Sequence, residues 1–456
     1  MKLKLLFLLV PFGILIKSQI GIMDPTYNVG TGANNFVYNV SIQSDQKIIA
    51  TGIFTQFNAY DRKFITRLNT DGSVDTTFNP MVTNNQSIYK TVIQNDGKII
   101  VGGSNQNNSG YIVRLNNDGS LDSTFTQPDM TFSGQPSDIS VLPDNKILVA
   151  GYLSNTGKTF QIYRLNPNGS LDDRFNAGNT GANNSISSLL ILPDHKILIG
   201  GYFTKYNGID RKGIARLNPD GTLDETFNPG FGVNSTIFAI ERQNDGKILI
   251  GGFFTSYNNT PRNFIARINS DGSLDSGFNP EVGANDGVSY INSTFYDKIL
   301  ISGAFTRYND VDKKYVAVLN SDGSLHNTAN DNSFDNAVNN CVIQNDGKLV
   351  CGGYFSNFKG QSSKGLVRII PTDLLSIDEI NSTKIKIAPN PTSDKITIFL
   401  EDNAKANLYD SNGKHISSFL LQTNQNTVDI SHHPSGIYII EIISKKQKRS
   451  FKLIKK

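Results

Sequence analysis

Short apolar runs alternate with polar turns along most of this chain, and the same arrangement returns seven times. Its clearest copy is the polar turn Asn244-Asp245-Gly246 followed by the apolar run Ile248-Leu249-Ile250. The lysine between them recurs every 48 to 51 residues, at Lys47, Lys98, Lys146, Lys196, Lys247, Lys298 and Lys348. A period near fifty residues is typical of a repeat architecture in which each copy is one supersecondary unit.

Within one repeat the pattern predicts four short strands, here over residues 237–240, 247–252, 263–268 and 274–278. The third strand carries an Arg-Leu-Asn motif, and the fourth carries Leu-Asp-x-x-Phe. Asp-Gly between two strand-like runs indicates a hairpin, and we expect both central turn residues to have positive φ. The glycine position is Gln46, Asn145 or His195 in other repeats, so His195 is expected to be a turn residue and not a ligand.

The second strand is apolar on both faces and must therefore be covered on both sides. Stacking four-stranded sheets radially achieves this, so the chain is predicted to be all-β, with a seven-bladed β-propeller over residues 20–371. The seventh repeat lacks a Leu-Asp-x-x-Phe segment, whereas Met23-Asp24-Pro25-Thr26-Tyr27 fits that pattern. We therefore expect the N-terminal segment to supply the outer strand of the last blade and to close the ring.

These three segments, recurring in step, resemble the delta-60 repeat family, whose β-propeller repeat has no known function and is common in secreted bacterial proteins. The resemblance spans residues 20–371 and supports the propeller prediction.

The repeat pattern ends after Pro371, and polar residues 372–383 are interpreted as a linker. Residues 384–456 contain seven short strand-like runs separated by Asn-Pro, Asn-Gly and Pro-Ser-Gly turns, which predict a small Ig-like β-sandwich.

Three motifs in this last part carry a second resemblance. They contain Pro389, Asn390 and Pro391, then Tyr409 and Gly413, then Gly436 and Tyr438. In this order they resemble the type A C-terminal sorting domain of type IX secretion cargo in Bacteroidetes. The resemblance implies the type IX secretion machinery as a partner, passage through the periplasm to the cell surface or the medium, and removal of the sorting domain within residues 371–384.

The first residues, with a basic start and an apolar run over 5–16, are predicted to be a secretory signal peptide over residues 1–19. No later run is long enough to predict a membrane span. Without the basic leader and the basic C-terminal tail, residues 20–375 carry a small net negative charge, which argues against nucleic acid as a partner.

Cys341 and Cys351 are the only cysteines, and both lie in the seventh repeat where other repeats have mostly aliphatic residues. Two interpretations stay open: small core residues, or a cross-strand disulfide that the exported compartment would permit.

The sequence offers no strong chemical motif. Gly157-Lys158-Thr159 has the wrong spacing and no helix for a phosphate loop, and the Asn-x-Asp-Gly-Ser turns lack the glutamate of a calcium loop. Five scattered histidines do not predict a metal site. No catalytic residue, metal or cofactor is therefore predicted. The repeated aromatic residues, such as Phe254 and Tyr257, are expected to pack between blades.

Function on a repeat scaffold is expected where the symmetry breaks. Glu241 and Arg242 stand in the inner strand of the fifth repeat, where Arg242 replaces an aliphatic residue of five other repeats. They are the candidate ligand-binding residues, with an ion pair at the rim as the alternative. The sequence thus predicts a secreted or surface-attached propeller that binds an extracellular glycan or protein, and it favours a non-catalytic role while leaving an enzyme open. The alternatives are an extracellular polysaccharide hydrolase or lyase with its site at the channel mouth, and a structural surface-layer component.

Overall fold

A computed structural model describes residues 20–82, 85–107, 109–126, 132–155, 158–159, 161–295, 298–326, 331–371, 385–388, 392–400, 403–410, 414–444 and 448–455. The expected signal peptide and linker lie outside these residues. The chain divides into two compact units, Met1–Asp373 and Leu374–Lys456, which are described separately.

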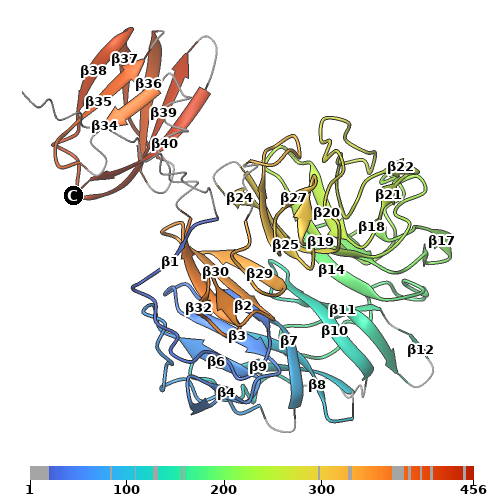
Figure 1. Ribbon diagram of the computed structural model, residues 1–456. Coiled ribbons are helices and arrows are strands. Elements are labelled where there is room, and N and C mark those ends of the chain that lie inside the picture. Colours follow the sequence, from blue (N-terminus) through green and yellow to red (C-terminus); the bar gives the residue numbers. More distant parts are fainter. Residues whose placement is uncertain are drawn as a thin grey trace, which may run out of the picture. The chain divides into compact units, whose positions relative to one another are not determined.

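The first strands of the seven repeats form a closed ring at the centre of the first unit (Figure 1). Each of them lies beside the first strands of both neighbouring repeats, including the last beside the first. They are β2 (Val37–Ile42), β7 (Asn85–Ile93), β10 (Phe132–Val141), β14 (Ile186–Ile191), β19 (Ile237–Arg242), β24 (Val288–Phe295) and β29 (Val338–Ile343). The predicted all-β, seven-bladed architecture is confirmed.

Two further antiparallel strands extend each blade outward. The second strands are almost fully buried, as their apolar composition on both faces requires. They are β3 (Ile48–Gly52), β8 (Ile99–Asn105), β11 (Ile147–Asn155), β15 (Ile197–Gly201), β20 (Ile248–Gly252), β25 (Lys298–Gly303) and β30 (Leu349–Gly353). The third strands are β6 (Ile65–Leu68), β9 (Ser109–Leu115), β13 (Ile162–Leu165), β18 (Ile214–Leu217), β23 (Ile265–Ile268), β28 (Val316–Leu319) and β33 (Leu366–Ile370).

The prediction of a regular fourth strand in each blade is wrong. In the first six blades it is reduced to one isolated bridge, such as Ile268 with Leu274 in the fifth. The chain then turns, because the Asp275 carboxylate accepts a hydrogen bond from the Gly277 amide and the Phe278 amide bonds the Asp275 carbonyl. This turn directs Phe278 into the core, where it is fully buried.

Five blades carry a small hairpin between their second and third strands. The hairpins are β4 (Gln56–Phe57) with β5 (Tyr60–Asp61), β16 (Lys205–Tyr206) with β17 (Ile209–Asp210), β21 (Ser256–Tyr257) with β22 (Thr260–Pro261), β26 (Arg307–Tyr308) with β27 (Val311–Asp312), and β31 (Asn357–Phe358) with β32 (Gln361–Ser362). The second and third blades have longer strands instead. There β9 pairs with β10, and β12 (Lys158–Thr159) pairs with β11, so the two blades share one seven-stranded sheet.

The hairpin turns differ from the prediction. Only the last turn residue has positive φ, at Gly246 (87°), His195 (64°) and Gln46 (67°), whereas Asp245 does not. The Gly246 amide bonds the Gln243 carbonyl and the Asp245 carboxylate accepts from the Lys247 amide. This is a type I turn followed by one left-handed residue, which needs the aspartate as a cap and not at positive φ. His195 is a turn residue, as expected.

The N-terminal segment closes the ring as predicted. Strand β1 (Ile22–Met23) pairs antiparallel with β33, with Ile22 opposite Ile370 and Met23 opposite Ile369. The last blade is therefore the four-stranded sheet β1-β33-β30-β29, built from both ends of the propeller sequence.

The hydrophobic core is divided among the junctions between blades. One cluster joins Leu198 and Ile214 of the fourth blade to Phe254, Tyr257 and their neighbours in the fifth. Phe54, Phe203, Phe305, Phe355, Tyr206 and Tyr308 are buried in the same way, so the repeated aromatic residues pack between blades, as expected.

The second unit is a sandwich of two antiparallel sheets around one core. One sheet contains β34 (Ile385–Ala388), β35 (Lys395–Leu400) and β38 (Asn424–Asp429). The other has the order β37 (His415–Leu421), β36 (Ala404–Asp410), β39 (Gly436–Ser444) and β40 (Lys448–Lys455).

Candidate functional site

Most of the repeated charged residues form a structural cluster at the outer edge of the blades, with the sixth blade as the exception. In the first blade the Asp75 carboxylate lies 2.8 Å from Arg67 Nε and 2.7 Å from Lys47 Nζ. The guanidinium carbon also lies 4.7 Å from the centre of the Phe78 ring, a cation–π contact. The Arg-Leu-Asn motif, the Leu-Asp-x-x-Phe motif and the repeat lysine therefore meet at one point.

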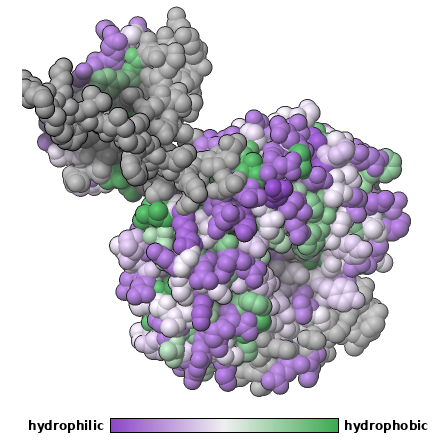
Figure 2. Space-filling model, viewed as in Figure 1, coloured by the Kyte–Doolittle hydropathy of each residue, from purple (hydrophilic) through white to green (hydrophobic). Residues whose placement is uncertain are grey.

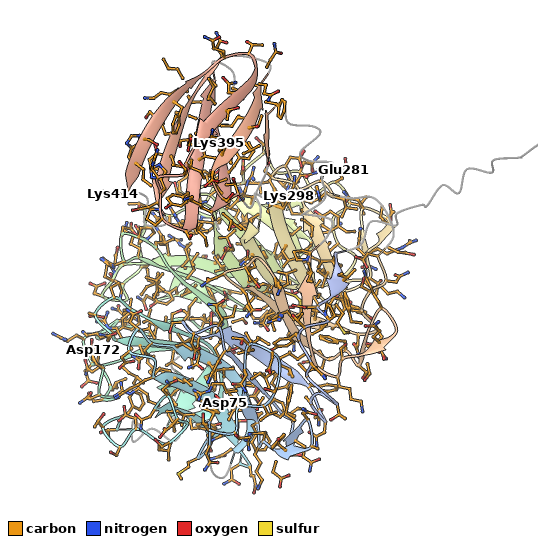
Figure 3. All side chains as sticks on the ribbon, turned by 90° about the vertical axis from the view of Figure 1, so that its left-hand side faces the viewer. Asp75, Asp172, Glu281, Lys298, Lys395 and Lys414 are labelled. Atoms are coloured by element: carbon orange, nitrogen blue, oxygen red, sulfur yellow. A yellow bond between two sulfur atoms is a disulfide. The ribbon has the colours of Figure 1, made fainter. Side chains whose placement is uncertain are left out.

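The same arginine links its blade to the next one. The second guanidinium nitrogen donates to a main-chain carbonyl of the following outer turn, as from Arg114 to Pro167 at 2.6 Å and from Arg164 to Pro219 at 2.5 Å. Asp75 and Asp172, labelled in Figure 3, belong to two such clusters in different blades. In the sixth blade Val318 replaces the arginine, and the outer segment of the blade that follows comes from the N-terminus instead of the repeat.

These carboxylates remain ionised. Burial raises the pKa of Asp275, but hydrogen bonds from Lys247 and the Gly277 amide, with the charge of Arg267, outweigh burial and lower the pKa to about 2. The pKa values of Asp75, Asp122, Asp172 and Asp224 are lowered for the same reasons. Groups so firmly held as anions serve as structural acceptors and not as proton donors.

A second group of polar residues lies on the inner ring. Asn39 accepts hydrogen bonds from the amide and hydroxyl of Thr91, and Asn340 both donates to and accepts from the main chain of Val40. Lys90 Nζ lies 2.9 Å from Asp138, whose other oxygen accepts from the Leu189 amide. The Lys90–Asp138 pair breaks the repeat symmetry, and our sequence reasoning missed it. The signal was present in the sequence. Lys90 and Asp138 are the charged residues at an inner-strand position that is uncharged in the other repeats.

Glu241 and Arg242 lie at the end of β19, but the structure does not bring them together. Glu241 points to the sixth blade, where its carboxylate accepts hydrogen bonds from the amide (3.3 Å) and hydroxyl (3.1 Å) of Ser293. Burial raises the pKa of Glu241 despite these bonds. Arg242 directs its guanidinium toward Gly246 of its own hairpin. The two side chains therefore point to different neighbours and not to each other, as expected of successive residues on a strand.

Aromatic side chains gather at the opposite end of the inner strands. The inner strands carry Tyr38, Tyr89 and Phe238 at equivalent β-bulges. Three more aromatic residues come directly after the second strands of their blades: Tyr202, Phe253 and Tyr354. The main-chain amide of each donates to the carbonyl of the residue just before the inner strand of the same blade. With Phe36 these residues are called the aromatic face. Three of these rings are well exposed: Phe36 at 39%, Tyr202 at 57% and Phe253 at 46%. By contrast, hydrophilic residues prevail on the side of the first unit that Figure 2 shows.

The densest part of the aromatic face spans the junctions of blades seven, one and two. Tyr38 and Tyr89 are stacked with ring centroids 5.6 Å apart and planes 8° apart. Tyr354 contacts Tyr38 and Phe36 edge-on, at 6.1 Å and 4.5 Å. Burial, and next the neighbouring Tyr354 and Tyr89, raise the pKa of Tyr38 to about 12, so its hydroxyl stays protonated and can donate. Three tyrosines from three blades thus form one group of contacting rings, each partly exposed.

The two cysteines form a disulfide, which is the second of the two interpretations left open by the sequence. Cys341 and Cys351 are directly opposite in the β29–β30 ladder and are bonded. Both are fully buried, in the same blade that β1 closes.

Within the described residues, no three His, Cys, Asp or Glu side chains come together as a metal site, and no helix is long and apolar enough to cross a membrane.

The residues of the predicted sorting motif lie in the second unit. The Tyr409 hydroxyl bonds Glu441 at 3.3 Å, and the buried Tyr438 donates from its hydroxyl to the Pro434 carbonyl at 2.6 Å. Gly436 begins β39. Pro389, Asn390, Pro391 and Gly413 lie outside the described residues.

Two family models match this chain. The "Domain of unknown function (DUF5122) beta-propeller" matches residues 43–78, 94–125, 142–175, 192–227, 243–278, 297–328 and 344–371, and the "Secretion system C-terminal sorting domain" matches residues 386–456. The chain belongs to the DUF5122 β-propeller family and carries a type IX sorting domain. It is therefore cargo of the type IX system, exported to the cell surface or the medium.

Solved structures are similar to this chain at low identity. One is PorZ, an essential bacterial surface component of the type IX secretion system of Porphyromonas gingivalis, with 15% identity, a TM-score of 0.45, and coverage of 93% of this chain and 60% of PorZ. The chain thus spans about 60% of PorZ. Another is the gluconolactonase XC5397 from Xanthomonas campestris, with 12% identity, a TM-score of 0.37, and coverage of 77% of this chain and 99% of that one. No curated protein matches the chain.

Proposed function

We propose that the propeller is a non-catalytic binding module that takes an extracellular glycan on its aromatic face. The observation that carries the proposal is the Tyr38–Tyr89–Tyr354 group, in which rings from three blades contact one another and each is partly exposed. Sugar rings offer an apolar C–H face and a hydroxyl edge, and tyrosine is suited to both because it has an apolar body and a polar tip.

Position within the fold supports the same assignment. The aromatic residues at this end are not shared by all repeats, since the position of Tyr38 is Ser137, Ser187, Ser289 or Asn339 in four blades. A packing role repeats with the blades, as it does for Phe254 and Tyr257, whereas a binding site need not. Export places the face where extracellular polymers are available.

The test is binding of the purified full chain to an array of extracellular polysaccharides, followed by titration of any glycan bound. The variant Tyr38→Ala/Tyr89→Ala should bind about tenfold or more weakly, as expected for loss of about 1.5 kcal/mol of aromatic contact. Tyr60→Ala is the matched control, because Tyr60 is 45% exposed on the β4–β5 hairpin. Capture of a protein without any glycan, or equal loss in the control, would contradict the proposal.

A hydrolase or lyase is the second candidate, and Glu241 is the observation that favours it. A half-buried carboxyl with a raised pKa suits a general acid. Turnover of a bound glycan that disappears in Glu241→Gln, with binding retained, would replace binding by catalysis as the function.

A further inference from the structure

None of the side chains that form the aromatic face is charged. They stand at three positions of each repeat, eleven and nine residues before the repeat lysine and six residues after it. In all seven repeats these positions hold aromatic residues, Ser, Thr, Asn, Gln, Gly, Ala or Ile, and never Asp, Glu, Lys, Arg or His. Main-chain pairing keeps the positions together, as between Tyr202 and Ser185 or Ser104 and Ser87. The face therefore offers ring surface, hydroxyls and amides, but no counter-ion.

The charged residues that directly adjoin these positions in sequence add no net positive charge. They are Lys90, Asp138 and Asp286. Lys90 Nζ lies 2.9 Å from Asp138, and the Asp286 carboxylate accepts a hydrogen bond from the Gly287 amide. An anionic group on the aromatic face would therefore lose hydration without gaining a counter-ion. A neutral sugar avoids this loss, and its hydroxyls can form hydrogen bonds with the serine hydroxyls of the face.

A second group of exposed rings lies on the third, fourth and fifth blades. Tyr152, Tyr202 and Phe253 all stand six residues after the repeat lysine, and Tyr152 is 59% exposed, much like the other two. The Phe253 ring is held from two sides. The Phe238 ring lies edge-on at 5.1 Å, and a Cβ on Gly287 of the next blade would come within 2.5 Å of the Phe253 ring. Glycine at that position thus leaves room for an exposed ring. These three residues are called the second aromatic group.

The two aromatic groups lie on opposite sides of the ring. The Tyr38–Tyr89–Tyr354 group spans blades seven, one and two, whereas the second aromatic group spans blades three to five. Because the seven blades form a closed ring, a chain that connects the groups must cross this end of the propeller. On the inner strands of blades three and four it passes Ser137 and Ser187, which are exposed and partly exposed.

Aromatic rings pack against the apolar faces of sugar rings, and several such contacts along one chain reinforce one another. We propose that the aromatic face binds an internal stretch of a neutral, linear polysaccharide, whose chain crosses from the Tyr38–Tyr89–Tyr354 group to the second aromatic group. This inference rests on the proposed function and adds two properties of the glycan, its lack of charge and its length.

The charge of the ligand is tested with the purified full chain and matched pairs of polymers. Polygalacturonate is compared with its methyl ester, and a sulfated galactan with its desulfated form, beside neutral glucans, xylans and mannans. Binding should be confined to the uncharged polymers and should stay unchanged as salt is raised, since its contacts contain no ion pair. An acidic polymer that binds as tightly as its uncharged partner would overturn the inference but leave glycan binding intact. If no glycan binds, the proposed function itself fails.

The length of the ligand is tested with variants of the two aromatic groups. Tyr202→Ala/Phe253→Ala should bind the polymer about tenfold more weakly, and so should Tyr38→Ala/Tyr89→Ala, because each removes one side of the contact. A disaccharide of the same sugar should also bind wild type more weakly than the polymer does. Tyr60→Ala is again the matched control and should bind like wild type, and thermal unfolding shows that all variants fold. Wild-type affinity of Tyr202→Ala/Phe253→Ala, or equal affinity for disaccharide and polymer, would overturn the inference even where Tyr38→Ala/Tyr89→Ala supports the proposed function.

Discussion

Asp24 and Arg368 are 344 residues apart in sequence, yet Arg368 Nε lies 2.8 Å from Asp24 Oδ2 in the interior of the last blade. Lys348 lies 3.0 Å from the same carboxylate, and the Arg368 guanidinium carbon lies 4.1 Å from the centre of the Tyr27 ring. The cluster that other blades build within one repeat is thus built here from both ends of the propeller. These contacts hold the N-terminal segment against the last blade and so stabilise the closed ring.

The first prediction concerns the contacts of Asp24 with Arg368 and Lys348. Asp24→Asn should lower the free energy of unfolding by about 3 kcal/mol, because it leaves Arg368 buried without its counter-ion. Asp224→Asn is the matched control, since Asp224 makes the same contacts inside one repeat. Both variants should lose stability, but hydrogen exchange of β1 and β33 should accelerate selectively in Asp24→Asn. Equal protection of β1 in both variants would show that the cluster does not control closure.

The second prediction concerns the Cys341–Cys351 disulfide. Replacing both cysteines by valine, the kind of residue found there in other repeats, preserves apolar packing but releases the cross-link. The free energy of unfolding should fall by about 2 to 3 kcal/mol for a loop of this length. Denaturation with and without reductant measures the effect, which should vanish in the double variant. Quantitative thiol labelling of the unfolded, unreduced protein would show instead that the bond does not form.

The third prediction is loss of stability in acid. Asp24 and Asp275 have pKa values of about 2 in the folded protein against an ordinary value of 3.8. The folded state therefore binds fewer protons than the unfolded chain, so this contribution is complete above pH about 4 and is lost as the pH falls toward about 2. Denaturation midpoints measured through this interval should fall more steeply for wild type than for Asp275→Asn. Parallel curves would exclude the clusters as the cause.

The fourth prediction uses the hairpin turns. His195 has a φ of 64° at the position where Gly246 has 87°, so His195→Gly should raise the free energy of unfolding by about 0.5 to 1 kcal/mol. Gly246→Ala should lower it by about 1 kcal/mol for the converse reason, since an added Cβ would meet only the Arg242 guanidinium, at an ordinary contact distance of 3.7 Å. Thermal denaturation of the two variants checks the sign, and a loss of stability in His195→Gly would contradict the assigned turn.

The repeat pattern predicts what depends on local residues: the seven blades, the left-handed turn position at His195 and the closing role of residues 23–27. It fails where a side chain competes with the ladder, as at Asp275, whose carboxylate turns the chain after one bridge and ends the expected fourth strand. The pattern also does not show which non-repeated side chains meet across blades. Tyr38 and Tyr89 stack although they are 51 positions apart, and Glu241 separates from Arg242 because strand geometry sends them to opposite sides. The bounds of the linker and of the signal peptide stay predictions.

The most direct measurement of the account as a whole is the intact mass and cellular location of the protein in its host, beside a variant truncated after Thr372. We expect the full chain to reach the surface or the medium without residues 1–19 and without its sorting domain, cut within residues 371–384. The truncated variant should stay in the periplasm. A full-length chain that remains periplasmic and uncut at its C-terminal end, or a truncated variant that is secreted normally, would contradict it.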